Sequence, residues 1–297
     1  MMVMKNTLSS GDVIQVINPK TKMGIELEFI DAPIKNVVTH LHKNADKLGY
    51  PIYVEDELDH IVNSIKGFRP AKTNKRAWQI IMDSSVSDCN DDGESIGGEI
   101  VSPILPINKD SFRQIHQVIR CMNRGGAEYS VKTGIHIHLD LYGIDRFVLL
   151  SIWAMMSENI YDVFDERILN RFAAEPYKIT SATRDHDPRY AMSLLLMSNS
   201  VTELLGEKYS SLHLYDRDDD PTHPMGEFRV GQMDEDPYLM TAWIKTCCQT
   251  VVEASHFRDA LDFLEQRYDY SFKALNNRSP SGLRWSMKEL DAMDVYI

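Results

Sequence analysis

The stretch Gly24-Ile25-Glu26-Leu27-Glu28-Phe29 decides the fold, because apolar and acidic side chains alternate along it with a period of two. Successive side chains of a β-strand point to opposite faces, so Glu26 and Glu28 share one face and the apolar side chains share the other. Two further stretches repeat the pattern: Gly134-Ile135-His136-Ile137-His138-Leu139-Asp140 and Gly226-Glu227-Phe228-Arg229-Val230. The sequence therefore predicts a sheet with one polar, acidic face and one apolar face that joins the core.

The shared polar face predicts a site for divalent metal ions. His136, His138 and Asp140 lie on this face in the second stretch, and Glu227 and Arg229 lie on it in the third. Acidic and imidazole groups gathered on one surface repel one another unless cations are present. We therefore interpret the face as a divalent-metal site that holds a polyphosphate.

Each motif also has a simpler interpretation when it is taken alone. Glu26 and Glu28 would suit the solvated face of an edge strand, and the two histidines would suit ordinary surface or core positions. Glu227 and Arg229 would suit a cross-strand ion pair of little energetic value. The metal interpretation depends on the motifs acting together.

Composition places the chain among ordinary globular proteins. It has 297 residues, of which 43% are hydrophobic and 26% charged, and its formal net charge is −12. This charge argues against a nucleic-acid-binding surface. The four cysteines form no CxxC pair, and residues 1–22 lack the apolar core of a signal peptide. No apolar run reaches the ~20 residues of a membrane helix, so we expect a cytoplasmic protein that does not contact membranes.

The order of predicted elements indicates an α+β fold, in which helices stack on the apolar face of the sheet. We expect a polar lead-in over residues 1–22 and a single domain over residues 23–297. The elements that we predict with defined ends are a helix after Pro33 that stops at Gly49, a helix capped by Asp110, a helix from Asp145 to Phe164, a strand from Lys208 to Tyr215, a loop from Asp216 to Pro224 and a long helix that reaches Tyr268.

The motifs, taken in order, resemble those of the amidoligases, which belong to the carboxylate–amine ligase superfamily of glutamine synthetase and glutamate–cysteine ligase. The resemblance runs from about Gly24 to Tyr238, and it is carried by Gly-x-Glu-x-Glu, Asp-x-Ser, Gly-Gly-Glu-x-Val-Ser-Pro, Gly-x-His-x-His and Glu-Phe-Arg. The segment Asp236-Pro237-Tyr238-Leu239 is also similar to the Asn-Pro-Tyr-Leu segment of glutamine synthetases.

The resemblance implies a curved antiparallel sheet that forms a funnel, with ATP at one end, the acceptor carboxylate at the other and Mg²⁺ or Mn²⁺ ions between them. It implies that Glu28 and Glu99 bind one ion. It further implies that a second ion is bound by Glu26, His136 and Glu227. Arg229 would face the γ-phosphate, His138 would stand near the nucleotide phosphates, and Lys208 would replace an arginine that contacts the nucleotide or a carboxylate.

The chemistry of amide formation independently needs such residues. A carboxylate is a poor electrophile, and ATP converts it to an acyl phosphate that an amine can attack. Hard cations on carboxylate ligands would neutralise the phosphate, and the planar fork of Arg229 would match it. Asp83 is our candidate for the base that deprotonates the amine. The substrates would be a small-molecule or peptide carboxylate and an amine.

Two other functions remain open at this point. A phosphotransferase on the same fold would leave the phosphoryl group on its acceptor. A relative without catalytic activity would only bind a nucleotide or peptide. The oligomeric state is also open, because nothing in the sequence marks a subunit interface.

Overall fold

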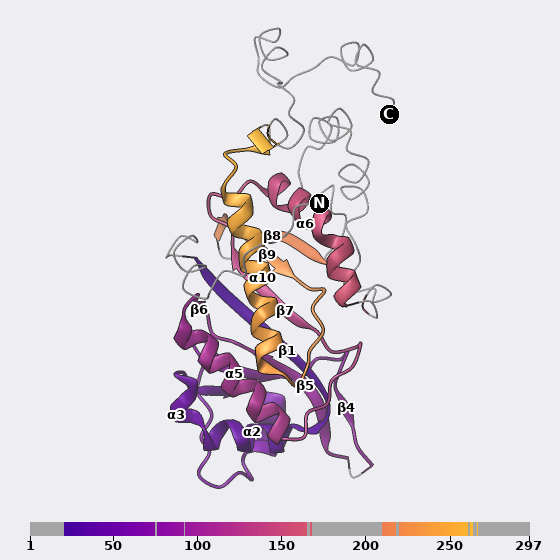
Figure 1. Ribbon diagram of the computed structural model, residues 1–297. Helices are drawn as coiled ribbons and strands as arrows, with labels where there is room; N and C mark the ends of the chain where they lie inside the picture. Colours follow the sequence, from indigo (N-terminus) through magenta and orange to yellow (C-terminus); the bar gives the residue numbers. More distant parts are fainter. Residues whose placement is uncertain are drawn as a thin grey trace. The chain divides into compact units, whose positions relative to one another are not determined.

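The computed structural model describes residues 21–74, 76–91, 93–164, 167, 210–217, 220–260, 262, 263 and 266 (Figure 1). The chain divides into two compact units, the first containing residues up to Asp140 together with Met225–Gln249, and the second containing Leu141–Pro224 and the residues from Thr250 onward. The predicted single domain over residues 23–297 stays a prediction. Lys208 and residues 1–20 of the predicted lead-in lie outside the described residues.

The sheet follows the strand order β2-β3-β5-β1-β7-β9-β8. Its strands are β1 (Lys22–Pro33), β2 (Ile52–Val54), β3 (Trp78–Ile81), β5 (Ser95–Val101), β7 (Ile135–Asp140), β8 (Leu212–Arg217) and β9 (Asp220–Phe228), and the short strands β4 (Asp88–Cys89) and β6 (Leu105–Pro106) pair with β5 and β1. Strand β1 runs antiparallel to β5 and β7, whereas β2 and β3 are parallel. The prediction of a largely antiparallel sheet backed by helices is therefore confirmed, the sheet is open, and the glutamine-synthetase-like funnel stays a prediction.

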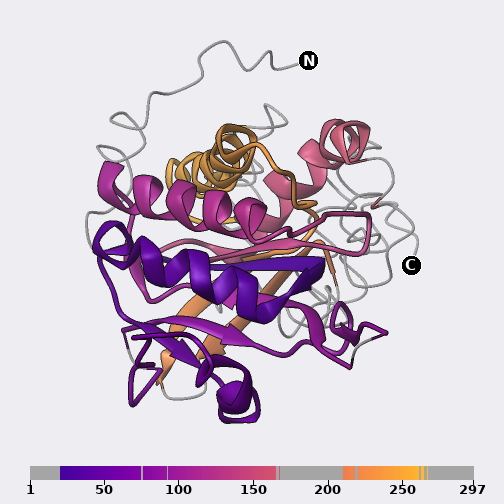
Figure 2. The same cartoon turned by 90° about the horizontal axis from the view of Figure 1, so that it is seen from below.

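Strand β1 has the two faces that its alternating sequence predicts. Ile25, Leu27 and Phe29 are fully buried on its apolar face. Helices α2 (Ile34–Lys43) and α5 (Lys109–Arg124) lie side by side against the sheet, as Figure 2 shows. Their buried residues are Ile34, Val37, Val38 and Leu41 of α2 and Ser111, Phe112, Ile115, Val118, Ile119, Cys121 and Met122 of α5. Burial of this apolar surface is what holds the sheet and the helices together.

The ends of these helices differ in part from the prediction. The helix after Pro33 is divided into α2 and α3 (Ala45–Leu48), and Gly49 ends α3 in the left-handed conformation, as predicted. The predicted cap at Asp110 was wrong, because Asn108 caps α5 and accepts a hydrogen bond from the backbone of Ser111 at 2.9 Å. Two further short helices among the described residues of this unit are η1 (Asp56–Leu58) and α4 (Asp59–Val62).

The later part of the chain contains two corrections. Helix α6 (Arg146–Val163) begins after Asp145, as expected. The predicted loop over residues 216–224 was wrong, because β9 begins at Asp220 and continues to Phe228. Helix α10 (Pro237–Ser255) ends thirteen residues before the predicted Tyr268. Among the described helices, none combines the length and the apolar composition that a crossing of a bilayer requires.

Candidate functional site

Strand register in the first unit brings the predicted polar residues together. Glu28 lies opposite Glu99 in the β1–β5 pair, and Glu26 lies opposite His136 in the β1–β7 pair. His138 in turn lies opposite Glu227 in the β7–β9 pair. Directly opposite residues have Cβ atoms about 5 Å apart, so the polar side chains of four neighbouring strands form one continuous surface.

Glu26 lies at the centre of this surface, where two imidazoles hold its carboxylate. Nδ1 of His136 lies 2.9 Å from Oε2 of Glu26, and Nε2 of His138 lies 2.9 Å from Oε1. Both rings therefore donate to the same carboxylate, one to each oxygen. This arrangement fixes the orientation of all three side chains relative to β1 and β7.

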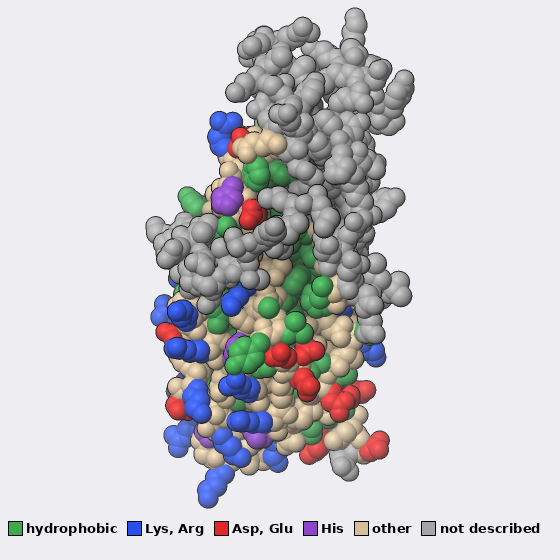
Figure 3. Space-filling view, viewed as in Figure 1, with side chains coloured by type: hydrophobic (Ala, Val, Ile, Leu, Met, Phe, Trp, Pro, Cys, Tyr) green, Lys and Arg blue, Asp and Glu red, His purple; other side chains and the backbone are tan. Residues whose placement is uncertain are grey.

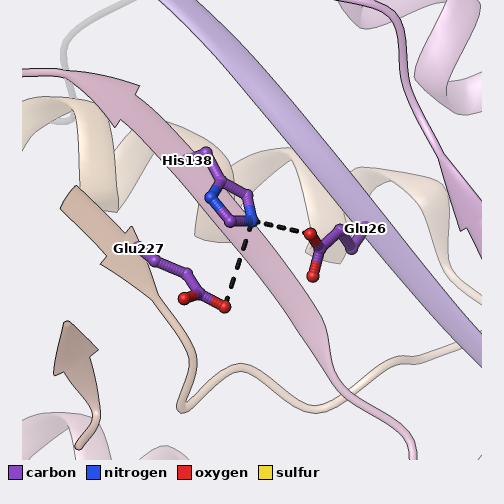
Figure 4. Close-up of side chains that lie close together, drawn as sticks. All are labelled: Glu26, His138 and Glu227. Carbon is purple, nitrogen blue, oxygen red and sulfur yellow. Dashed lines mark hydrogen bonds and ion pairs between the residues drawn. The ribbon is translucent and has the colours of Figure 1, made fainter. Parts of the chain in front are cut away.

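Glu227 completes a compact set of three potential ligands. Its Oε1 lies 3.9 Å from Nε2 of His138 and 3.8 Å from Nδ1 of His136. One donor atom each from Glu26, His138 and Glu227 falls within 4.8 Å of the others, and Figure 4 shows these three side chains pointing toward one another from β1, β7 and β9. The resemblance assigns His136, not His138, to this ion, and His136 is within reach of the same group. The assignment of ligands to individual ions stays a prediction.

Arg229 is the basic member of the surface. It is buried and forms an ion pair with Glu227, two residues earlier on the same face of the chain. Its guanidinium therefore lies beside the carboxylates, where its positive charge can act on any anion that enters the site.

Glu28 is anchored from the neighbouring strand. Its Oε2 accepts a hydrogen bond from the backbone N–H of Gly134 at 2.5 Å, and its backbone N–H donates to the carbonyl of Gly134 at 3.1 Å. Its other carboxylate oxygen, Oε1, faces Nε2 of His136 at 3.7 Å. This anchor could not be predicted from the sequence, because a backbone donor just before β7 carries no side-chain signal.

The neighbours of Glu26 and of His138 shift the pKa values of these two groups in opposite directions. Burial raises the pKa of Glu26, but the hydrogen bonds and charges of the two histidines hold it well below its ordinary value. Burial lowers the pKa of His138, yet the hydrogen bond and charge of Glu26 together with the charge of Glu227 raise it overall. Glu26 and His138 therefore favour their charged forms as a pair.

Glu99 is the member of the surface whose carboxyl group has a raised pKa. Burial raises its pKa to about 9, and the negative charges of Glu26, Glu28 and Asp83 contribute to the same shift. At neutral pH this carboxyl is therefore protonated in the protein without metal. A group of this kind ionises when a cation neutralises the surrounding charge, which is the behaviour expected of a metal ligand.

Asp83 follows the end of β3 and heads a turn. Its carboxylate accepts a hydrogen bond from the backbone of Ser85 at 2.7 Å, and its backbone carbonyl accepts from Val86 and Ser87. The turn places the charge of Asp83 close enough to raise the pKa of Glu99. The predicted general base thus lies at the edge of the carboxylate surface, and its catalytic role stays a prediction.

The donor set suits hard divalent cations. Carboxylate oxygens with an occasional imidazole are the ligands that Mg²⁺ and Mn²⁺ prefer, and the set contains no thiolate. Cys247 and Cys248 are fully buried in α10, and burial raises the pKa of both thiols. They are therefore inert core residues, as their position in an apolar helical stretch predicts.

Comparison with models of known protein families identifies the family of the chain. A family model described as "Putative amidoligase enzyme" matches residues 19–218 of the 297-residue chain. The matched range includes Glu26, Glu28, Glu99, His136 and His138, whereas Glu227 and Arg229 lie beyond its end. Comparison with curated proteins returned no match.

Proposed function

Because this chain belongs to the amidoligase family, we propose that it is an ATP-dependent ligase that joins a carboxylate to an amine through an acyl phosphate. The family description supports an enzyme of the ligase type. ATP, the divalent metal and the acyl phosphate are parts of the proposal.

The observation that carries the proposal is the convergence of acidic and imidazole side chains from β1, β5, β7 and β9 on one face of the sheet. Glu28, Glu99 and Glu227 are each at most 7% exposed. Burying so many carboxylates costs free energy unless their charge is compensated. Such an arrangement suits a site in which bound cations compensate the carboxylates and hold a phosphate group. It has no evident value for folding.

The residues present fit the proposed metal ions. Glu28 and Glu99 would hold one ion, and Glu26, His136 and Glu227 would hold a second. Bound Mg²⁺ or Mn²⁺ would neutralise the charge of the triphosphate and align the phosphoryl group that is transferred.

The reaction proceeds in two balanced steps. An oxygen of the substrate carboxylate attacks the γ-phosphorus of ATP, and ADP leaves. The nitrogen of the amine then attacks the acyl carbon, loses a proton, and displaces inorganic phosphate as the amide bond forms. The phosphoryl group needs positioning and charge compensation more than covalent help from the protein.

The side chains of the chain have separate tasks in these steps. Arg229 holds the phosphoryl group through its planar guanidinium as negative charge moves onto it. His138, whose raised pKa favours its positive form, contacts the nucleotide phosphates. Asp83 accepts the proton that the attacking amine loses. Lys208, which lies outside the described residues, is a further candidate for contact with the nucleotide or a carboxylate.

An ADP-release assay tests the proposal. The purified chain with Mg²⁺ and ATP is incubated with mixtures of carboxylates and amines, and with hydroxylamine as a surrogate amine. A ligase releases ADP and phosphate in equal amounts only when both substrates are present. Phosphorylation of an acceptor without an amine would instead identify a phosphotransferase, and nucleotide binding without turnover in any mixture would identify a binding protein.

A pair of variants connects the activity to the site. Glu227→Gln removes one potential ligand while keeping the shape of the side chain, so turnover should fall by at least a hundredfold with the fold intact. Glu57→Gln makes the same chemical change on the exposed surface of η1 and should leave turnover unchanged. Wild-type turnover in Glu227→Gln would remove the carboxylate surface from the mechanism.

A further inference from the structure

The outer surface of the helix layer is basic, although the chain as a whole is acidic. Helices α2, α3 and α5 together hold seven lysines and arginines and two aspartates. They therefore carry +5, which leaves −17 for the rest of a chain whose net charge is −12. Figure 3 shows blue side chains gathered over the region where these three helices lie.

The exposed cations of this surface lie close to one another. Lys43, Lys47, Arg120 and Arg124 are all exposed, and Arg120 and Arg124 are one helical turn apart on α5. We call these four residues the basic face. None of the four forms an ion pair with a carboxylate among the described residues, whereas Arg113 of the same helix pairs with Asp110.

Two histidines lie within the electrostatic reach of these cations. Burial lowers the pKa of His40, and the charges of Lys43 and Arg124 lower it further. Burial also lowers the pKa of His116, and the charges of Arg120 and Lys245 add to this effect, whereas the charge of Asp236 opposes it. Lys43 and Arg124 thus act on His40, and Arg120 and Lys245 act on His116.

Exposed apolar side chains border the basic face. Tyr238 is 66% exposed at the first turn of α10, and its ring lies edge-on to His116 with the centroids 4.8 Å apart. Leu239, next to it, is 45% exposed. Exposed aromatic and apolar residues beside arginines are the composition of a protein-binding surface rather than of a merely solvated one.

We propose that the basic face, together with Tyr238 and Leu239, binds an acidic polypeptide segment that also carries apolar side chains. Charge complementarity selects the partner, because an acidic segment is attracted to this face and repelled by the rest of the chain. A short acidic segment can contact the basic face alone, whereas the net negative charge of the rest of the chain disfavours binding of a long nucleic acid. The apolar side chains of the partner cover Tyr238 and Leu239.

Fluorescence anisotropy with a defined probe tests the proposal. The probe is a fluorescein-labelled peptide of four Glu-Glu-Phe repeats, added to the full chain at about 50 mM salt. The chain should bind this peptide and ignore a Lys-Lys-Phe peptide of the same length, and salt at about 300 mM should weaken the binding because it screens the charges. Absence of binding at low salt, or tighter binding of a DNA duplex than of the peptide, would overturn the proposal.

Charge-reversal variants locate the binding. In Lys47→Glu/Arg120→Glu/Arg124→Glu, peptide affinity should fall by at least about tenfold. The matched control, Lys66→Glu/Lys72→Glu/Arg76→Glu, makes the same change in net charge on exposed residues between α4 and β3, and its affinity should fall by less than about threefold. Equal losses in both variants would mean that net charge alone governs binding and would refute the assigned surface. If the reversal variant does not fold, as judged by circular dichroism, Arg120→Gln/Arg124→Gln provides the same comparison.

Discussion

Replacing Glu99 by glutamine should stabilise the metal-free protein at neutral pH. Glu99 is buried among Glu26, Glu28 and Asp83, and burial together with these charges raises its pKa to about 9 from an ordinary value of 4.5. The folded chain therefore keeps a proton on Glu99 at pH values at which the unfolded chain has lost it. Glutamine has nearly the same shape and cannot ionise, so the variant avoids this difference between the two states.

The magnitude follows from the two pKa values. The contribution of Glu99 to stability is fully present below pH 4.5 and is lost progressively as the pH rises to about 9. Within this window the free energy of unfolding of the wild type falls by roughly 1.4 kcal/mol per pH unit. At pH 7 the accumulated loss is about 3 kcal/mol, and Glu99→Gln should recover that amount.

Urea unfolding, followed by tryptophan fluorescence in the presence of EDTA, measures the effect. The difference in free energy of unfolding between Glu99→Gln and wild type should be about 3 kcal/mol at pH 7 and below about 0.5 kcal/mol at pH 4.5. Because only the difference is used, titrating groups common to both proteins cancel. Saturating Mn²⁺ should remove the advantage of the variant. A ligand stabilises a folded chain more when it binds that chain more tightly, and the wild type keeps the proposed metal ligand Glu99, which the variant lacks.

Two outcomes would refute this reasoning. A gain of the same size at both pH values would mean that glutamine packs better for reasons unrelated to charge. No gain at pH 7 would mean that the carboxylates are not crowded enough to keep Glu99 protonated. Glu57→Gln, on the exposed surface of η1, serves as the control and should change stability by less than about 0.5 kcal/mol at either pH.

Three further predictions test separate parts of the structure. Gly231→Ala should lower the free energy of unfolding by about 2–3 kcal/mol, because the added Cβ would lie 2.2 Å from Nε1 of Trp243; urea unfolding measures it, and a loss below about 0.5 kcal/mol would contradict the packing. Cys89 alone should react with Ellman's reagent in the folded chain, since the other three cysteines are buried; more than one fast-reacting thiol would show that α5 or α10 is open. Arg229→Lys should keep Mn²⁺ affinity within about threefold while ADP release slows at least about tenfold, because a point charge cannot replace the planar fork; an unchanged rate would exclude Arg229 from phosphate contact.

The faces of the strands were predictable from the sequence, because alternation along a strand fixes which side chains share a face. Glu26, His138 and Glu227 were placed on the polar face for this reason, and the structure brings their donor atoms within 4.8 Å of one another. The distribution of ligands could not be predicted with equal detail. It depends on whether His136 or His138 reaches Glu227, and this in turn depends on strand register and on side-chain rotamers.

The ends of elements were less predictable, since competing local signals lie close together. Asn108 and Asp110 are both residue types that cap helices well, and the structure uses Asn108, whose side chain accepts from the backbone N–H of Ser111. The acidic residues and prolines between Asp216 and Pro224 are typical of a loop, yet β9 begins at Asp220. Backbone hydrogen bonds of a sheet do not require apolar side chains, so composition alone missed this strand.

The position of Glu99 beside Asp83 depends on a close approach of two backbones, which explains why two glycines precede Glu99. Gly97 has a φ of +70°, and a Cβ at this residue would lie 2.2 Å from the carbonyl oxygen of Val86. The hydroxyl of Ser87 accepts from the backbone N–H of Asp83 at 3.1 Å and donates to the carbonyl of Gly97 at 3.4 Å. The turn that begins at Asp83 is thus fastened to β5 two residues before Glu99. A side chain at Gly97 would push this turn away, so the same glycine that permits the bend also keeps the proposed base beside the proposed metal ligand.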